Sequence, residues 1–156
     1  NLPSTIHVTA PPHTFTAPPV GIEVEIPLGN IATLVGATLE PETGNLEPGS
    51  SVTITLIWRA EDTATKSYRV FLHLLDSEGN LIAQSDAIPA GWTRPTTGWL
   101  PGEYITDAHT LTIPPAASAG DYTLSTGLYI PGGERLTTPD GSDAIHLTRV
   151  TVQPAP

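Results

Sequence analysis

Short runs in which apolar and polar residues alternate follow one another along most of the chain. In residues 51–58, SVTITLIW, the apolar side chains fall at every second position: Val52, Ile54, Leu56 and Trp58. Successive side chains of a β-strand point to opposite faces, so this run predicts a strand with one buried and one solvated face. Residues 68–75 are apolar on both faces, which predicts a central strand that is covered on its second side too.

Turn-forming residues separate these runs at short intervals. Gly79-Asn80 stands at the tip of a predicted hairpin. Proline and glycine break the pattern again in the stretches PETGNLEPGS, PPAASAG and PGGER, and no segment of helical length shows a 3.6-residue period. About nine short strands joined by hairpins or brief loops predict an all-β fold, an antiparallel β-sandwich of immunoglobulin-like or jelly-roll-like type.

Residues 1–19 differ from the rest because they are rich in proline and threonine. This composition favours an extended or polyproline conformation, so we expect an N-terminal arm or linker followed by a single β-sandwich domain at residues 20–156. The run STIHVTA within the arm also fits an edge strand. The chain contains no methionine, so we expect it to be a processed product or a piece of a larger chain that acts beside neighbouring domains.

The charge of the chain narrows the classes of partner. The net charge is −10 and Lys66 is the one lysine. Nucleic acids require a basic footprint, which this composition lacks, and binding to an anionic membrane surface is disfavoured for the same reason. No apolar run approaches the roughly 20 residues that span a bilayer, so we expect no direct membrane insertion. The absence of cysteine excludes disulfides, thiol catalysis and cysteine-ligated zinc.

No motif supplies a complete set of catalytic groups. Glu103 and Asp107 would share one face of a regular strand about 13 to 14 Å apart, which exceeds the roughly 6.5 to 9.5 Å of inverting glycosidases. Glu103 is better explained as an acceptor for backbone donors in the PGE turn. No serine lies in a GxSxG motif, and no phosphate-binding glycine loop is present. We therefore expect that the chain is not an enzyme and uses no cofactor.

Two sets of residues are candidate metal ligands. His73, His109 and His146 fall on different predicted strands, without the spacing typical of a zinc site. Asp140 and Asp143 in PDGSD offer hard oxygen ligands for calcium, but a DG pair in a loop is far more often a simple turn. We predict no metal site.

Carbohydrate binding is the strongest positive hypothesis. Sugars stack on exposed aromatic rings while neighbouring polar groups bind their hydroxyls. The candidate ligand-binding residues are Trp92, Arg94, Trp99, Glu103 and His73. Each tryptophan has an alternative role, since a loop that crosses a β-sandwich needs an apolar anchor, and His73 on a strand apolar on both faces also fits a buried, hydrogen-bonded histidine. Trp58 lies on the buried face of its strand and is expected in the core.

The order of several short elements adds a resemblance. Five elements follow one another in order within residues 28–136: LGNIATLVGATL, EPGSSVTITLIWRA, YRVFLHLLDSEGNLIAQSD, RPTTGWLPGEYITDAHTL and AGDYTLSTGLYIPGGERL. Together they resemble a β-sandwich domain at the extracytoplasmic C-terminal end of bacterial mannosyltransferase-like membrane proteins and in related envelope proteins. The resemblance that they carry covers about residues 28–153. The resemblance implies an accessory domain outside the membrane without a catalytic assignment. Trp92 and Arg94 depart from it, because smaller residues are expected in that loop.

From these observations we expect a non-catalytic accessory domain of a larger extracytoplasmic envelope protein or secreted protein. Its expected partners are a glycan, or the glycan-bearing product of an attached enzyme, and the neighbouring domains of the parent chain. The alternative is a structural spacer or a protein–protein interaction module with no small ligand.

Overall fold

The computed structural model describes residues 13–42 and 44–154. Nearly all regular structure in this part of the chain is β. The strands are β1 (Ile22–Leu28), β2 (Ala32–Glu40), β3 (Asn45–Leu46), β4 (Ser51–Ala60), β5 (Arg69–Leu75), β6 (Leu81–Ala87), β7 (Tyr104–Thr112), β8 (Gly120–Tyr129) and β9 (Ile145–Val152). A single 3-10 turn, η2 (Thr96–Gly98), lies between β6 and β7.

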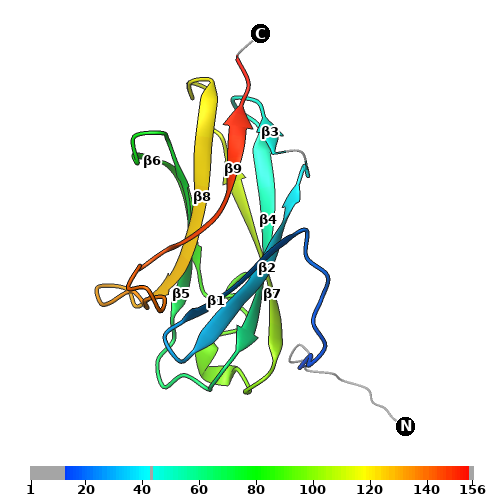
Figure 1. Cartoon of the computed structure of the whole chain (residues 1–156), viewed down its shortest axis with the longest axis vertical. Coiled ribbons are helices and arrows are strands. Elements are labelled where there is room, and N and C mark those ends of the chain that lie inside the picture. Colours follow the sequence, from blue (N-terminus) through cyan, green and yellow to red (C-terminus); the bar gives the residue numbers. More distant parts are fainter. Residues whose placement is uncertain (1–12, 43, 155–156) are drawn as a thin grey trace.

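The strands form two sheets that pack face to face (Figure 1). One sheet has the order β1-β2-β4-β7, and the other has the order β3-β9-β8-β5-β6. All pairs are antiparallel except the short pair β3–β9. The predicted β-sandwich is confirmed. Because β6 and β7 are both edge strands, they meet along one open side of the sandwich.

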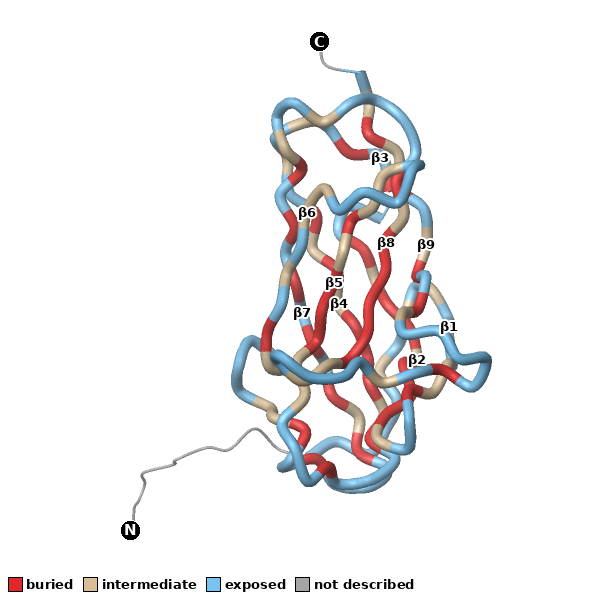
Figure 2. The backbone as a smooth tube through the Cα atoms, turned by 90° about the vertical axis from the view of Figure 1, so that its left-hand side faces the viewer, coloured by how far each residue is buried: buried red, intermediate tan, exposed pale blue. Residues whose placement is uncertain are grey.

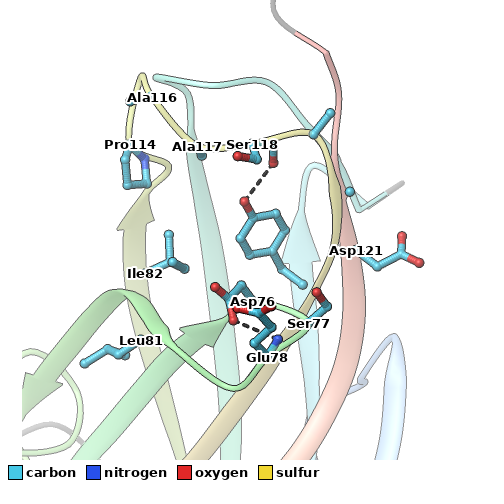
Figure 3. Close-up of a pocket in the computed structure, with 13 residues that line it drawn as sticks. Asp76, Ser77, Glu78, Leu81, Ile82, Pro114, Ala116, Ala117, Ser118 and Asp121 are labelled. Carbon is cyan, nitrogen blue, oxygen red and sulfur yellow. Dashed lines mark hydrogen bonds between the residues drawn. The ribbon is translucent and has the colours of Figure 1, made fainter.

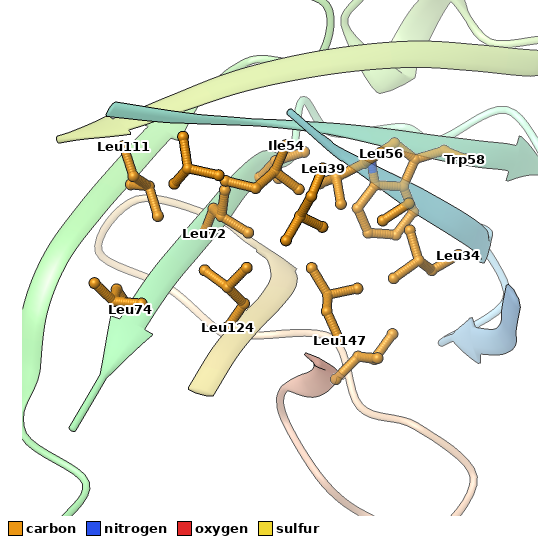
Figure 4. Packing of buried hydrophobic residues seen from close by; sticks show 14 of the residues in the cluster. Leu34, Leu39, Ile54, Leu56, Trp58, Leu72, Leu74, Leu111, Leu124 and Leu147 are labelled. Atoms are coloured by element: carbon orange, nitrogen blue, oxygen red, sulfur yellow. The ribbon is translucent and has the colours of Figure 1, made fainter. Parts of the chain in front are cut away.

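The core lies between the two sheets, and the period-2 pattern of β4 supplies much of it. The four apolar residues predicted on its buried face are fully buried: Val52, Ile54, Leu56 and Trp58. In Figure 4 side chains of β4 meet Leu72 and Leu124 of the opposite sheet. Figure 2 shows the same pattern along the backbone, with buried positions concentrated in the middle strands. Trp58 is therefore a core residue, as its position in the pattern predicts.

The outer face of β5 is also covered, which confirms the prediction for residues 68–75. Phe71 points away from the core yet is only 1% exposed. Its ring lies over Gly127 of the neighbouring strand, and the Arg135 guanidinium from the loop after β8 lies 4.2 Å from the ring centre. A side chain at Gly127 would occupy the space of the Phe71 ring.

Two segments meet near the start of β7. Thr14, in the described part of the predicted arm, forms an antiparallel bridge with Tyr104, whose N–H donates to the Thr14 carbonyl at 2.7 Å. The STIHVTA run lies outside the described residues. The connection from β6 to β7 runs across the same end, at the bottom of Figure 1. No helix among the described residues is long and apolar enough to cross a membrane.

Candidate ligand-binding site

The connection after β6 makes a tight left-handed turn, here called the tryptophan loop (residues 88–95). Ala90, Gly91 and Trp92 have consecutive positive φ angles of 58°, 63° and 75°. A left-handed conformation costs a residue with a Cβ about 1 to 2 kcal/mol, so two of these three positions are strained. The N–H of Trp92 donates to the Ile88 carbonyl at 2.9 Å, which closes the turn. Strain of this kind persists only where surrounding contacts impose it.

The turn places the Trp92 side chain at the surface. Trp92 is 54% exposed. Among the large apolar and aromatic residues that the structure describes, Phe15 alone has a higher exposed fraction. The Arg69 guanidinium carbon, at the start of β5, lies 5.0 Å from the ring centre. This cation–π contact holds one side of the ring against the sheet. The exposed remainder offers an apolar surface beside a cation.

Two polar residues continue this surface along the outer face of the five-stranded sheet. Tyr129 of β8 lies directly opposite Arg69, and its hydroxyl donates to the Asp86 carboxylate of β6 at 2.7 Å. Burial and then the bond to Asp86 raise the pKa of Tyr129, while Arg69 acts in the opposite direction. The phenol therefore stays protonated and works as a donor at neutral pH.

His73 lies on the same outer face, two residues along β5 from Phe71, and its ring centre is 4.6 Å from that of Phe71. Burial lowers the pKa of His73; Asp86 opposes this effect and Arg135 adds to it. A neutral imidazole offers one donor and one acceptor. We call Arg69, His73, Asp86, Trp92 and Tyr129 the outer-face cluster.

Glu103 lies beneath the tryptophan loop and binds Arg94 near the end of that loop. Glu103 is fully buried, and its carboxylate accepts hydrogen bonds from Arg94, from the Leu100 N–H at 3.0 Å and from His13 Nδ1 at 2.7 Å. Burial alone would raise the pKa of Glu103, but these donors, with Arg94 first, bring the pKa below its usual value. The bond to Leu100 is the backbone contact that the PGE turn predicts.

Trp99 is also buried, with no exposed surface, and its indole Nε1 donates to the Arg94 carbonyl at 2.9 Å. The five predicted binding residues therefore separate into two groups. Trp92 and His73 belong to the outer-face cluster. Trp99 and Glu103 cannot stack on or bind a surface sugar in this conformation, because no part of either side chain is exposed. Both instead bind Arg94 of the loop: Glu103 binds the Arg94 side chain, and the Trp99 indole binds the Arg94 carbonyl. This fits the anchoring alternative for Trp99, and a ligand-binding role for Arg94 stays a prediction.

A buried polar chain that the sequence does not reveal joins the two sheets on the open side. Ser85 Oγ lies 2.9 Å from His109 Nδ1, and His109 Nε2 lies 2.8 Å from Asp107 Oδ2. The Asp107 carboxylate also accepts from Trp58 Nε1 at 3.2 Å and from the Ala90 N–H at 2.8 Å. A carboxylate only accepts, so Nε2 of a neutral His109 donates to it and Nδ1 accepts from the serine.

The hydrogen-bonded series Ser85, His109 and Asp107 has the order of a hydrolase triad, but its surroundings differ from those of a triad. A triad presents its serine in a cleft beside oxyanion donors. Ser85 is half-buried, and it does not line the cleft at the far end of the sandwich or the smaller one beside Thr14 and Arg94. The Asp107 oxygens are occupied by indole, imidazole and backbone donors. The arrangement serves to join β6, β7 and the tryptophan loop.

The histidines considered as zinc ligands do not converge. His73 and His146 flank Ser125 on the outer face, whereas His109 points into the sandwich. Within the described residues no group of three His, Asp or Glu side chains is arranged to hold a metal ion. Asp140 instead accepts from the Thr138 hydroxyl and the Ser142 N–H, as in a turn, and Asp143 pairs with Arg135 at 3.4 Å.

A concave surface lies at the far end of the sandwich, away from the outer-face cluster (Figure 3). This cleft, of about 430 Å³, lies between the 76–81 turn and residues 114–122. Its polar groups serve the fold: Asp76 accepts from the N–H groups of Glu78 and Asn80, and the Tyr122 hydroxyl donates to the Ser118 carbonyl. Tyr122 is buried and offers no exposed ring. The cleft lacks the exposed aromatic surface of the tryptophan loop.

The sequence pattern missed Arg69 and Asp86 as candidate site residues. Alternation along β5 places Arg69 on the face of Phe71 and His73, so extending the pattern by one step would have found it. Asp86 lies on a strand of mixed polarity, and only its pairing with Phe71 brings it to the cluster. That pairing is set by the hairpin and cannot be read from residues 81–87 alone.

One solved structure places the fold among known proteins. The chain is similar to the crystal structure of the C-terminal domain of Wzt, with a TM-score of 0.61 and 14% sequence identity over 88% of this chain and 84% of that one. At this identity the likeness shows the fold alone. No family model matches the chain, and no curated protein matches it. The resemblance to domains of mannosyltransferase-like membrane proteins stays a prediction.

Proposed function

We propose that this domain is a non-catalytic carbohydrate-binding module that acts outside the cytoplasm as part of a larger envelope or secreted protein. The glycan binds against Trp92 and is oriented by the polar groups of the outer-face cluster. The similarity to the Wzt C-terminal domain is compatible with an accessory role, as is the resemblance to domains attached to mannosyltransferase-like proteins.

The exposed Trp92 ring on a strained turn is the observation that carries the proposal. A large aromatic side chain at 54% exposure loses the free energy that burial would provide. The left-handed backbone at Ala90 and Trp92 adds further cost. A loop that only covered the sandwich would turn this ring inward, as it does for Trp99. An apolar ring beside Arg69, Asp86 and Tyr129 suits a sugar, whose C–H face stacks while its hydroxyls bind the polar groups.

Binding without catalysis fits the chemistry of the cluster. Asp86 is the one carboxylate of the outer-face cluster, and it accepts from Tyr129. Glycoside hydrolysis uses a pair of carboxylates that flank the bond. Two carboxylates resemble such a pair: Asp107 of β7 and Glu103, which directly precedes β7. Both are buried and face the interior. The cluster therefore offers orientation and stacking rather than an acid and a base.

Intrinsic fluorescence tests the proposal, because Trp92 is exposed while Trp58 and Trp99 are not. The protein is titrated with a panel of neutral and acidic oligosaccharides that includes α-mannosides, alongside Trp92→Ala and the control Leu100→Ala. We expect a saturable spectral change that Trp92→Ala abolishes and Leu100→Ala preserves. A flat response to every saccharide would contradict carbohydrate binding.

An interaction module is the second candidate, favoured by the exposed apolar groups at the same end. Phe15 and Leu100 are 57% and 42% exposed, and Phe15 lies beside the turn at Gly102. Exposed apolar groups that gather at one end suit contact with a neighbouring domain of the parent chain. Phe15→Ser with Leu100→Ser separates the two functions, because it should weaken domain contact and leave saccharide binding through Trp92 intact.

A further inference from the structure

Two buried carboxylates of the same sheet edge bind the two ends of one short loop segment. Asp107 accepts from the Ala90 N–H at 2.8 Å, and Glu103 accepts from the Arg94 side chain. Trp92 lies midway between these two attachment points. We infer that Asp107 and Glu103 are positioning residues that hold the Trp92 ring in its binding conformation. This inference rests on the proposed function of Trp92.

The geometry of β7 makes the arrangement possible. Glu103, Ile105 and Asp107 are all buried and alternate with exposed or half-buried residues, so they face the same way, toward the sandwich interior. The tryptophan loop crosses the open side next to that face. Each carboxylate therefore meets the loop from below, at a different end of the turn. Neither needs to touch the ligand in order to affect Trp92.

The donors around each carboxylate leave little freedom to move. Asp107 binds the Trp58 indole, His109 and the Ala90 N–H, so both of its oxygens are fixed by groups of the core. Among the described residues, the groups that face His109 from the opposite sheet include Ser85, which fixes its second nitrogen. Movement of Ala90 would therefore break a bond to a carboxylate that cannot follow it.

Stability alone does not explain two buried carboxylates. Replacing a buried ionic group by apolar residues of similar volume is often neutral or stabilising, because desolvation opposes the gain from pairing. Such groups are retained in some proteins because they specify one conformation. Here the conformation specified is the left-handed turn at Ala90 and Trp92, which the chain would not adopt by local preference.

The hydrogen-exchange rate of the Ala90 amide tests the positioning role in the protein without a ligand. We compare the wild-type protein with Asp107→Leu, which removes both acceptors, and with Asp107→Asn, which keeps one oxygen for the Ala90 N–H. Thr126→Val is the matched control, because it removes a buried 2.8 Å bond to the Phe71 carbonyl that does not involve the loop. Exchange at Ala90 is expressed relative to the core amide of Leu124 in each variant.

We expect Asp107→Leu to raise the relative exchange of Ala90 at least tenfold, while Asp107→Asn and Thr126→Val stay within threefold of wild type. Affinity for the saccharide that binds the wild type should follow the same order. If Asp107→Leu does not fold, Glu103→Gln tests the other end through the exchange of Arg94. The inference would be overturned if Ala90 exchanged equally in Asp107→Leu and Thr126→Val. Where Glu103→Gln serves as the test, equal exchange of Arg94 in that variant and the wild type would overturn it.

The two proposals fail in different ways. If no saccharide binds the wild-type protein, the proposed function is wrong, and hydrogen exchange still reports whether the carboxylates hold the loop. If saccharide binds and Asp107→Leu loosens Ala90 without weakening affinity, then Trp92 needs no positioning and the inference is wrong while the function stands.

Discussion

The backbone N–H of Ala90 donates to the buried carboxylate of Asp107 at 2.8 Å. This bond links a strained surface turn to the interior of the sandwich, two residues before the exposed ring of Trp92. At the other end of the turn, Arg94 is bound by Glu103. A β-sandwich edge that could have been closed by apolar packing is instead closed by two carboxylates, and the turn between them presents an aromatic ring to solvent.

Glycine is usually more destabilising than alanine within a folded chain, but at position 92 we expect the glycine variant to be the more stable of the two. Because φ at this position is 75°, Trp92→Gly should unfold with a free energy about 1 kcal/mol higher than that of Trp92→Ala, since glycine enters the left-handed region freely. Urea unfolding of the two variants measures the difference. A more stable alanine variant would mean that the turn does not keep its left-handed form in solution.

The pH dependence of stability should reveal the pairing of Glu103. Its pKa in the folded protein is below that of the unfolded chain, about 4.3. The folded state then binds fewer protons than the unfolded state in this range, so the contribution of Glu103 is present above about pH 4.3 and is lost as the pH falls through the folded pKa.

Glu103→Gln removes this titration. Urea unfolding at intervals between pH 7 and pH 3 should show a smaller loss of stability in the variant than in the wild type over the acidic part of the range. Parallel curves for the two proteins would contradict the prediction.

The outer face depends on the absence of a side chain at Gly127. A Cβ there would lie 2.5 Å and 2.6 Å from two atoms of the Phe71 ring. Gly127→Ala should therefore lower the free energy of unfolding by about 1 to 3 kcal/mol, as expected for overpacking. Gly98→Ala is the control, since a Cβ at Gly98 meets nothing within 4 Å. Chemical denaturation measures both, and similar stabilities of the two variants would show that Phe71 moves aside without cost.

Arg69 should contribute more to ligand affinity than to stability. Its contact with Trp92 is partly exposed and worth about 0.5 to 1 kcal/mol, so Arg69→Gln should change the free energy of unfolding by no more than that amount. The affinity of the Arg69→Gln variant for the saccharide should fall about tenfold relative to the wild type, which corresponds to about 1.4 kcal/mol. Calorimetric titration against Arg149→Gln, an exposed arginine on β9, is the comparison. Equal affinities of the two variants would remove Arg69 from the site.

The sequence predicts the sandwich well because its signal is local. Alternation along residues 51–58 identifies the buried face of β4 directly, and the apolar character of both faces of residues 68–75 anticipates the burial of Phe71. The burial of Trp58 follows from the same rule. These inferences need only the two-residue period of a strand and do not depend on which strands pair.

The site is predicted only in part, because it depends on pairing and on backbone conformation. The sequence places Trp92 and Trp99 in one loop, but only the left-handed turn and the bond from the Trp99 indole to Arg94 decide which ring is exposed. The proximity of Asp86 to Tyr129 follows from the register of β5 with two neighbours. No local pattern contains that information.

The indole N–H signals of a ¹⁵N-labelled protein test the central claim most directly. The Trp58 and Trp99 indoles are bound to Asp107 and to the Arg94 carbonyl, whereas Trp92 is exposed. During titration with the saccharide panel, we predict a saturable shift of the Trp92 indole together with amides of the tryptophan loop and the outer-face cluster, while the other two indoles change little. An unchanged Trp92 signal with every saccharide, or shifts confined to the far-end cleft, would contradict the account.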